Sequence, residues 1–119
     1  MKVVSGSTRM VFVFKSNVIK IPNIRNYKLF LNGILSNLQE NEFSKIGRVD
    51  LAKVKYCDFL GIILVMDKAC RVNIPLNLLK KTLEKKYKYD YMKEFMLSDF
   101  KLSNWGVVGT ELVKVDYGS

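Results

Sequence analysis

The chain has 119 residues, of which 49% are hydrophobic, and this predicts one globular domain over residues 1–119 with its own core. Its formal net charge of +9 favours polyanionic ligands, which include nucleic acids, nucleotide phosphates and acidic protein surfaces. The sequence contains no histidine, which excludes histidine-based metal sites and histidine-dependent nucleophiles.

Several observations predict a cytoplasmic protein. The sequence has no run of about 20 apolar residues, so we expect no membrane span. The first residues, "MKVVSGSTRM", lack the apolar segment of a secretion signal. Cys57 and Cys70 are expected to stay reduced, because two thiols in a domain of this size are more typical of the cytosol.

The first part of the chain predicts three strands. The segment "KVVSGSTRMVFVFKSNVIKIP" is rich in β-branched and aromatic residues, and it is interrupted at Gly6 and at residues 15–17. Pro22 ends the third strand, because proline cannot donate a hydrogen bond to a strand ladder.

A helix is predicted from about Asn26 to Ile46, with Gly47 as its stop. An apolar stripe at helical spacing predicts its buried face: Leu31, Ile34, Leu35 and Leu38. The next position on that stripe is Glu42, and a buried carboxylate requires a cation nearby. Glu42 is therefore a candidate site residue, whereas Glu40 is expected to face solvent.

The second part predicts two strands, one or two helices and a hairpin. The strands are "LAKVKYC" and "GIILVM", with a turn at Asp58 and Gly61. Pro75 begins a helical stretch that is interrupted near residues 87–91, and "WGVV" and "LVKV" form the hairpin. The predicted fold class is α+β.

A lysine-rich segment lies in the predicted second helix and just after it. Its basic residues are Lys80, Lys81, Lys85, Lys86, Lys88 and Lys93, and Tyr87, Tyr89 and Tyr91 alternate with the last of them. Three readings remain open for this segment: a solvated helix face, a surface that binds a protein partner, and a surface that grips a nucleic acid.

Four segments in this order resemble the protein-kinase-like fold over nearly the whole chain. "SGSTRMVFVF" stands at the position of the glycine-rich loop, although only Gly6 remains of its glycines. "NVIKIP" is similar to the strand motif V-A-I-K, and "GIILVMDKA" is similar to the last lobe strand and the hinge. "SDFKLSNWGVVGTELVKVDYG" matches D-x-K-x-x-N followed by a hairpin and D-Y-G in place of D-F-G.

The resemblance implies an architecture and a set of cofactors. It implies a kinase-like N-lobe in residues 1–66, with a five-stranded antiparallel sheet and one αC-like helix. A hinge at 67–72 and a reduced C-lobe in 73–119, with a minimal helical remnant and a terminal β-hairpin, would follow. The implied cofactors are ATP and Mg²⁺.

The resemblance also implies roles for individual residues. Gly6 and Ser7 would approach the phosphates, and Lys20 would bind phosphate and pair with Glu42, with Glu40 as the fallback. Met66 would be the gatekeeper, and backbone groups of Asp67 and Ala69 would bind the adenine edge. The remaining roles are Asp99 as base, Lys101 at the transferred phosphoryl group, and Asn104 with Asp116 as Mg²⁺ ligands.

The departures from the family leave three functions open. Leu97-Ser98 replaces the usual His-Arg, and the helical region is much shorter than in full kinases. The short form resembles truncated kinase-like proteins of tailed bacteriophages, which would place the protein in the host cytoplasm. The alternatives are a minimal ATP·Mg²⁺ phosphotransferase acting on a serine or threonine of a protein or on itself, a pseudokinase-like protein that binds and modulates a host protein, and a basic nucleic-acid-binding domain. An oligomer is also compatible with so reduced a lobe.

Overall fold

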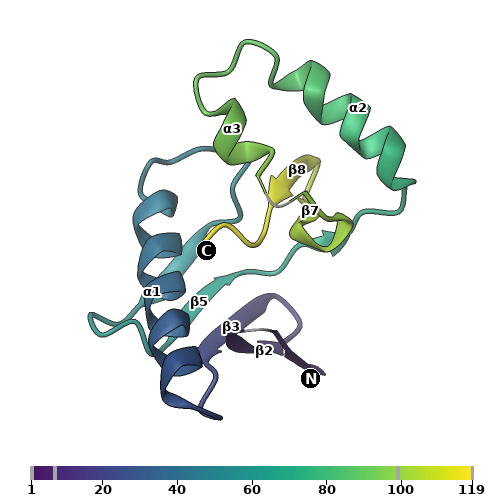
Figure 1. Ribbon diagram of the computed structural model, residues 1–119. Helices are drawn as coiled ribbons and strands as arrows, with labels where there is room; N and C mark the ends of the chain where they lie inside the picture. Colours follow the sequence, from purple (N-terminus) through teal and green to yellow (C-terminus); the bar gives the residue numbers. More distant parts are fainter. Residues whose placement is uncertain (1, 7, 99, 119) are drawn as a thin grey trace.

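The computed structural model describes residues 2–6, 8–98 and 100–118, and it has an α+β architecture. A five-stranded antiparallel sheet runs in the order β1-β2-β3-β5-β4 (Figure 1). The strand bounds are β1 Lys2–Ser5, β2 Arg9–Val13, β3 Asn17–Pro22, β4 Val54–Cys57 and β5 Leu64–Asp67. The predicted fold class and the five strands are confirmed.

The central strand β3 positions Lys20. This residue pairs with Val11 of β2 on one side and with Leu64 of β5 on the other. β3 ends at Pro22, as the sequence predicted. Lys20 therefore lies on a strand that is paired on both sides.

The long helix α1, Tyr27–Ser44, packs against β3 and β4. The Asn26 side chain caps its first turn by accepting a hydrogen bond from the Leu29 backbone N–H (2.9 Å). Gly47 lies just beyond its end with a φ of 82°, a conformation that glycine adopts without strain. The predicted helix is confirmed to within a few residues at each end.

The face that α1 buries is polar, and the predicted apolar face is wrong. The buried residues of the helix are Gly33, Ser36, Asn37 and Glu40. Leu31 and Leu35, from the predicted core stripe, are exposed. A side chain at Gly33 would collide with the Thr8 carbonyl and with Pro22, so the backbone of the helix approaches the sheet closely there.

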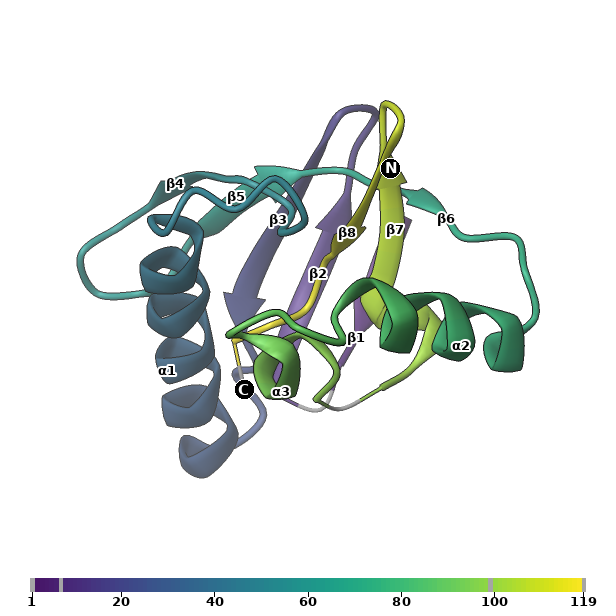
Figure 2. The ribbon, with the colours of Figure 1, turned by 90° about the horizontal axis from the view of Figure 1, so that it is seen from above.

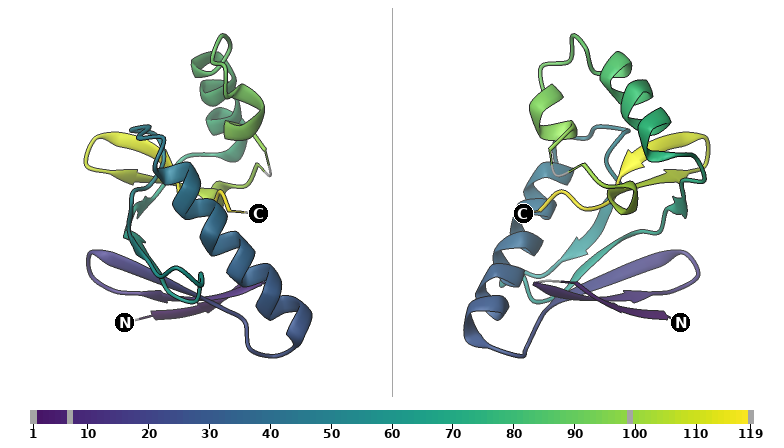
Figure 3. Two further views of the ribbon diagram at one scale, coloured as in Figure 1. Left: turned by 90° about the vertical axis from the view of Figure 1, so that its left-hand side faces the viewer. Right: turned by 45° about the vertical axis from the view of Figure 1, so that its right-hand side comes forward.

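The rest of the chain forms a second sheet and short helices. The strands β6 Cys70–Arg71, β7 Trp105–Val108 and β8 Glu111–Lys114 make a three-stranded sheet that includes the predicted hairpin. The helices are α2 Leu76–Lys86, α3 Lys93–Met96 and a 3₁₀ turn at Leu102–Asn104. The three-stranded sheet lies between the five-stranded sheet and helices α2 and α3 (Figures 1 and 3).

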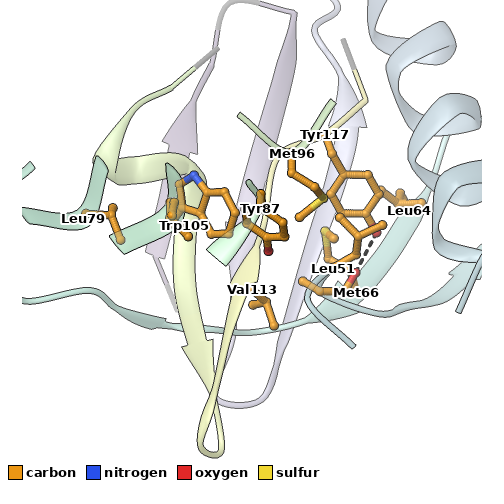
Figure 4. Packing of buried hydrophobic residues seen from close by; sticks show 11 residues of the cluster. Leu51, Leu64, Met66, Leu79, Tyr87, Met96, Trp105, Val113 and Tyr117 are labelled. Carbon is orange, nitrogen blue, oxygen red and sulfur yellow. Dashed lines mark hydrogen bonds between the residues drawn. The ribbon is translucent and has the colours of Figure 1, made fainter. Parts of the chain in front are cut away.

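The hydrophobic core joins these layers. Its fully buried members come from β5, α2, α3, both hairpin strands and the C-terminal segment, and several are large (Figure 4). The Tyr117 ring packs in this core while its hydroxyl donates a hydrogen bond to the Ala52 carbonyl (2.6 Å). The C-terminal segment is thereby fixed between the core and α1 (Figure 2).

A charged cluster fastens the α2–α3 connection to the segment after α1. Arg48 donates two hydrogen bonds to Asp50 (both 2.8 Å) and two to Asp90 (3.1 and 2.8 Å). The Tyr87 hydroxyl donates to the same Asp50 carboxylate (2.7 Å). We refer to Arg48, Asp50, Tyr87 and Asp90 as the Arg48 cluster.

Candidate phosphate-binding cavity

A cavity of about 900 Å³ lies beside one face of strands β1–β3. Its walls come from widely separated parts of the sequence: the first three strands, residues 66–71, residues 101–104, and residues 115–116. The wall at the strands is apolar, with Val4, Val11, Val13 and Val18, and Met66 adds to it from β5. Such a wall suits a flat aromatic group, and Arg9, Lys20 and Asp116 form a charged group at one end of it.

Lys20 is buried at this charged end and is paired on both sides. Its Nζ donates to Glu40 Oε1 (2.9 Å) and to the Val115 backbone carbonyl (2.9 Å). The Lys20 side chain is only 7% exposed, and that of Glu40 is fully buried. Each charge therefore offsets the cost of burying the other.

The partner of Lys20 is Glu40, and the predicted Glu42 is wrong. The Glu42 side chain is 71% exposed and forms an ion pair with Lys45 on the same helix. The error follows from the reversed face of α1, because a helix that buries Gly33 and Asn37 turns position 40 inward and position 42 outward. Glu40, the alternative partner that the sequence suggested, is thus the residue that pairs with Lys20.

Glu40 joins the N-terminal and C-terminal parts of the chain. Its Oε2 atom accepts hydrogen bonds from Arg9 Nη2 (2.8 Å) and from the backbone N–H groups of Tyr117 and Gly118 (both 3.0 Å). Burial alone would raise the pKa of Glu40, but the charge of Lys20 and the hydrogen bonds and charge of Arg9 outweigh it and lower that pKa to about 2. Glu40 is therefore ionised at every pH at which the protein would normally be studied.

Gly118 is required where the C-terminal segment meets α1. A Cβ atom at this position would overlap the Ser36 carbonyl and the side chain of Glu40. Gly118 therefore lets the backbone approach α1 closely. At this distance the backbone N–H groups of Tyr117 and Gly118 reach the Glu40 carboxylate.

Arg9 is the principal site residue that the sequence analysis missed. It is buried at the start of β2, where its Nη1 donates to Asn37 Oδ1 (3.1 Å). Its Nη2 donates to both Glu40 Oε2 and Asp116 Oδ1, each at 2.8 Å. Burial alone would lower the pKa of Arg9, but the hydrogen bonds and charges of the two carboxylates raise it. We refer to Arg9, Lys20, Glu40 and Asp116 as the Glu40 cluster.

Most of the other predicted site residues line the same cavity. These are Gly6, Met66, Asp67, Ala69, Lys101, Asn104 and Asp116. The backbone N–H of Asp67 already donates to the Lys53 carbonyl (2.9 Å), so this group is engaged within the protein. Ser7 and Asp99 lie outside the described residues.

The predicted magnesium ligands lie at the cavity, but the described residues do not fit a metal site as they stand. Asn104 and Asp116 offer the oxygen ligands that Mg²⁺ prefers. However, the one carboxylate of this pair is bound to the Arg9 guanidinium. Within 2–6, 8–98 and 100–118, no group of three or more histidine, cysteine or acidic side chains is arranged to hold a metal ion.

The charge of the cavity favours an anion. Six cationic side chains of the described residues line it, against two carboxylates. The cations are Lys2, Arg9, Lys20, Lys68, Arg71 and Lys101, and the carboxylates are Asp67 and Asp116. The side chains that line the cavity therefore carry a net positive charge, which favours a phosphorylated ligand.

The lysine-rich segment lies away from this cavity. Lys80, Lys81 and Lys85 are exposed on α2, and Lys86 lies 3.9 Å from Glu111. The Lys88 ammonium lies over the Tyr89 ring, 5.3 Å from its centroid. The side chains that line the cavity and those of the basic helix therefore form two separate surfaces.

Comparison with known proteins yields no assignment: no family model matches the chain, and no curated protein matches it significantly. The structure likewise has no helix, within the part of the chain that it describes, that is long and apolar enough to cross a bilayer.

Proposed function

We propose that the cavity beside β1–β3 binds a nucleoside phosphate such as ATP. The observation that carries the proposal is the convergence of Lys20, Asn104 and Asp116 on one cavity, which residues 66–69 also line. These residues are separated by up to 96 positions in the sequence, and the Lys20–Glu40 pair is fixed by the fold.

The walls of the cavity support one pose for the proposed ligand. The base lies against Val13 and Val18, beside residues 66–69, where apolar contact favours an aromatic ring. The phosphates point toward Lys20, because Lys20 pairs with Leu64 whereas Asn17, three residues earlier in β3, pairs with Asp67, which puts Lys20 away from residues 66–69. The proposal concerns binding, because the base that the kinase resemblance assigns, Asp99, lies outside the described residues.

Calorimetric titration and thermal shift with ATP test the proposal. Val13 lines the cavity and pairs with Val18, which in turn pairs with Met66, so Val13→Phe places extra bulk where the base would lie. The matched control is Val3→Phe, because Val3 is exposed on β1 and alternates with the cavity-lining Lys2 and Val4. ATP at about a hundred times its dissociation constant should stabilise the protein by about 2.7 kcal/mol. We expect this gain in wild type and Val3→Phe and its loss in Val13→Phe; the absence of any gain in wild type would refute the proposal.

A second candidate function is binding of a protein partner through an apolar surface. On α1, Tyr27, Leu31 and Leu35 share a face and are 78%, 45% and 54% exposed. The β4–β5 turn packs on the same helix through Gly61, and its Phe59 and Leu60 are also exposed. A set of large exposed apolar side chains on adjoining elements is typical of an interaction surface.

The net charge of +9 favours an acidic partner over a second copy of the chain. The test compares Leu35→Glu with Lys81→Glu, which alters the basic helix instead. An acidic protein that wild type and Lys81→Glu retain, and that Leu35→Glu loses, supports the apolar surface. Retention by Leu35→Glu with loss by Lys81→Glu would assign the partner to the basic helix, and self-association in light scattering would replace the acidic partner by a second copy.

A further inference from the structure

The contact between Arg9 and Asp116 sets the charge of the proposed nucleotide site. Arg9 Nη2 lies 2.8 Å from Asp116 Oδ1, and the Arg9 side chain is 7% exposed whereas that of Asp116 is 48% exposed. The guanidinium thus approaches the carboxylate from the protein side, and the carboxylate itself reaches the cavity. In a metal-dependent site a divalent ion would bind the Asp116 carboxylate. Here the Arg9 guanidinium binds it instead.

We infer that Arg9 takes the electrostatic place of a divalent metal at Asp116, so that the cavity binds its nucleoside phosphate without Mg²⁺. The inference rests on the proposed function, and it specifies the form of the ligand as the metal-free nucleotide. It departs from the ATP·Mg²⁺ complex that the kinase resemblance implies.

Arg9 is held too firmly for a metal to displace it at small cost. The guanidinium contacts three different side chains, Asn37, Glu40 and Asp116. If it moved out, the fully buried Glu40 would lose a charge-assisted hydrogen bond, and the buried Asn37 oxygen would lose its donor. If it stayed, a divalent ion at Asp116 would lie beside a cation in a partly water-excluded site, where like charges repel strongly.

The remaining charge of the cavity suits a ligand that brings no cation of its own. Glu40 and Asp116 are already matched by Lys20 and Arg9, so the Glu40 cluster is close to neutral. Three other lining cations, Lys2, Lys68 and Arg71, exceed the one other lining carboxylate of the described residues, Asp67. Asp67 in turn forms an ion pair with Lys55, so the net charge of the cavity wall as a whole is positive and attracts an anionic ligand.

The experiment titrates ATP into the full-length chain in EDTA and, separately, in excess MgCl₂. In wild type we expect the two dissociation constants to agree within about threefold. In Arg9→Gln the carboxylate is released from its cation, and we expect affinity in EDTA to fall while Mg²⁺ restores it by about tenfold or more. Lys80→Gln, which removes a lysine of the exposed helix, should behave as wild type.

Each outcome separates the inference from the proposed function. Binding by wild type that is about tenfold or more tighter in MgCl₂ overturns the inference and leaves nucleotide binding standing. Absence of binding in both buffers refutes the proposed function, and the inference with it. If Arg9→Gln does not fold, titration of wild type with Mn²⁺ alone, followed by electron paramagnetic resonance, decides: a tight site contradicts the inference, and the absence of one supports it.

Discussion

Arg9 and Arg48 make the same kind of contact in two parts of the molecule, because each guanidinium bridges two carboxylates that are far apart in the sequence. Arg9 joins Glu40 to Asp116 across the cavity end of α1, and Arg48 joins Asp50 to Asp90 beneath the α2–α3 connection. Asp90 and Tyr87 do not line the cavity, whereas Arg9, Lys20 and Asp116 do. The same ion-pair geometry can thus serve as a structural clasp or as part of the proposed nucleotide site, and only Arg9 lies at the cavity beside β1–β3.

The Glu40 cluster should show the largest single effect on stability. Glu40→Gln leaves two buried cations with one carboxylate fewer, and we expect a loss of about 3–5 kcal/mol in the free energy of unfolding. Glu42→Gln is the matched control on the same helix, because its ion pair is exposed and should contribute less than about 1 kcal/mol. Urea unfolding of both variants measures the difference; equal losses would show that Glu40 is not the buried partner of Lys20.

The pH dependence of stability should follow the same residue. The pKa of Glu40 is lowered from its model-compound value of 4.5 to about 2 in the fold, so its contribution is present above about pH 4.5 and is lost as the pH falls toward 2. This amounts to about 2 kcal/mol between pH 7 and pH 3. Urea titrations at the two pH values should show that loss in wild type.

A variant isolates this contribution from other acids. The pKa of Asp50 is also lowered, because the hydrogen bonds from Arg48 and Tyr87 outweigh the opposing effect of burial, so some acid sensitivity belongs to the Arg48 cluster. Glu40→Gln should therefore lose part of the pH dependence and keep the rest. An unchanged slope in Glu40→Gln would mean that Glu40 titrates normally in the folded protein.

The sequence predicted the order of elements well because local signals determine it. The β-branched runs, Pro22, Gly47 and the turn at Gly109 each act within a few residues, and the fold places strands, helix end and hairpin accordingly. The third strand of the second sheet, β6, was not predicted, because two residues carry no periodic pattern. Lys20, Asn104 and Asp116 lie at one cavity, as their motif order suggested.

The register of α1 could not be predicted from its apolar stripe. The helix buries small and polar residues because the C-terminal segment, 77 positions from Glu40 at Tyr117, presents backbone donors to it. A search for small and polar residues at helical spacing, Gly33, Ser36, Asn37 and Glu40, would have found the buried face. Arg9 escaped notice because its carboxylate partners lie 31 and 107 positions away, which no local pattern reveals.

The Arg48 cluster should give a smaller effect, confined to stability. Asp50→Asn keeps an oxygen that can accept from Tyr87 but removes one of the two charges that Arg48 contacts, so we expect a loss of about 1–2 kcal/mol. Because Tyr87 and Asp90 lie away from the cavity, the dissociation constant for ATP should stay within about twofold of wild type. Unfolding in urea and calorimetric titration of the same sample measure both quantities. A fall in ATP affinity in Asp50→Asn would show that the two arginine clusters are coupled. If the Arg48 cluster is independent of the cavity, its loss changes only the fraction of folded protein and not the affinity of the folded state.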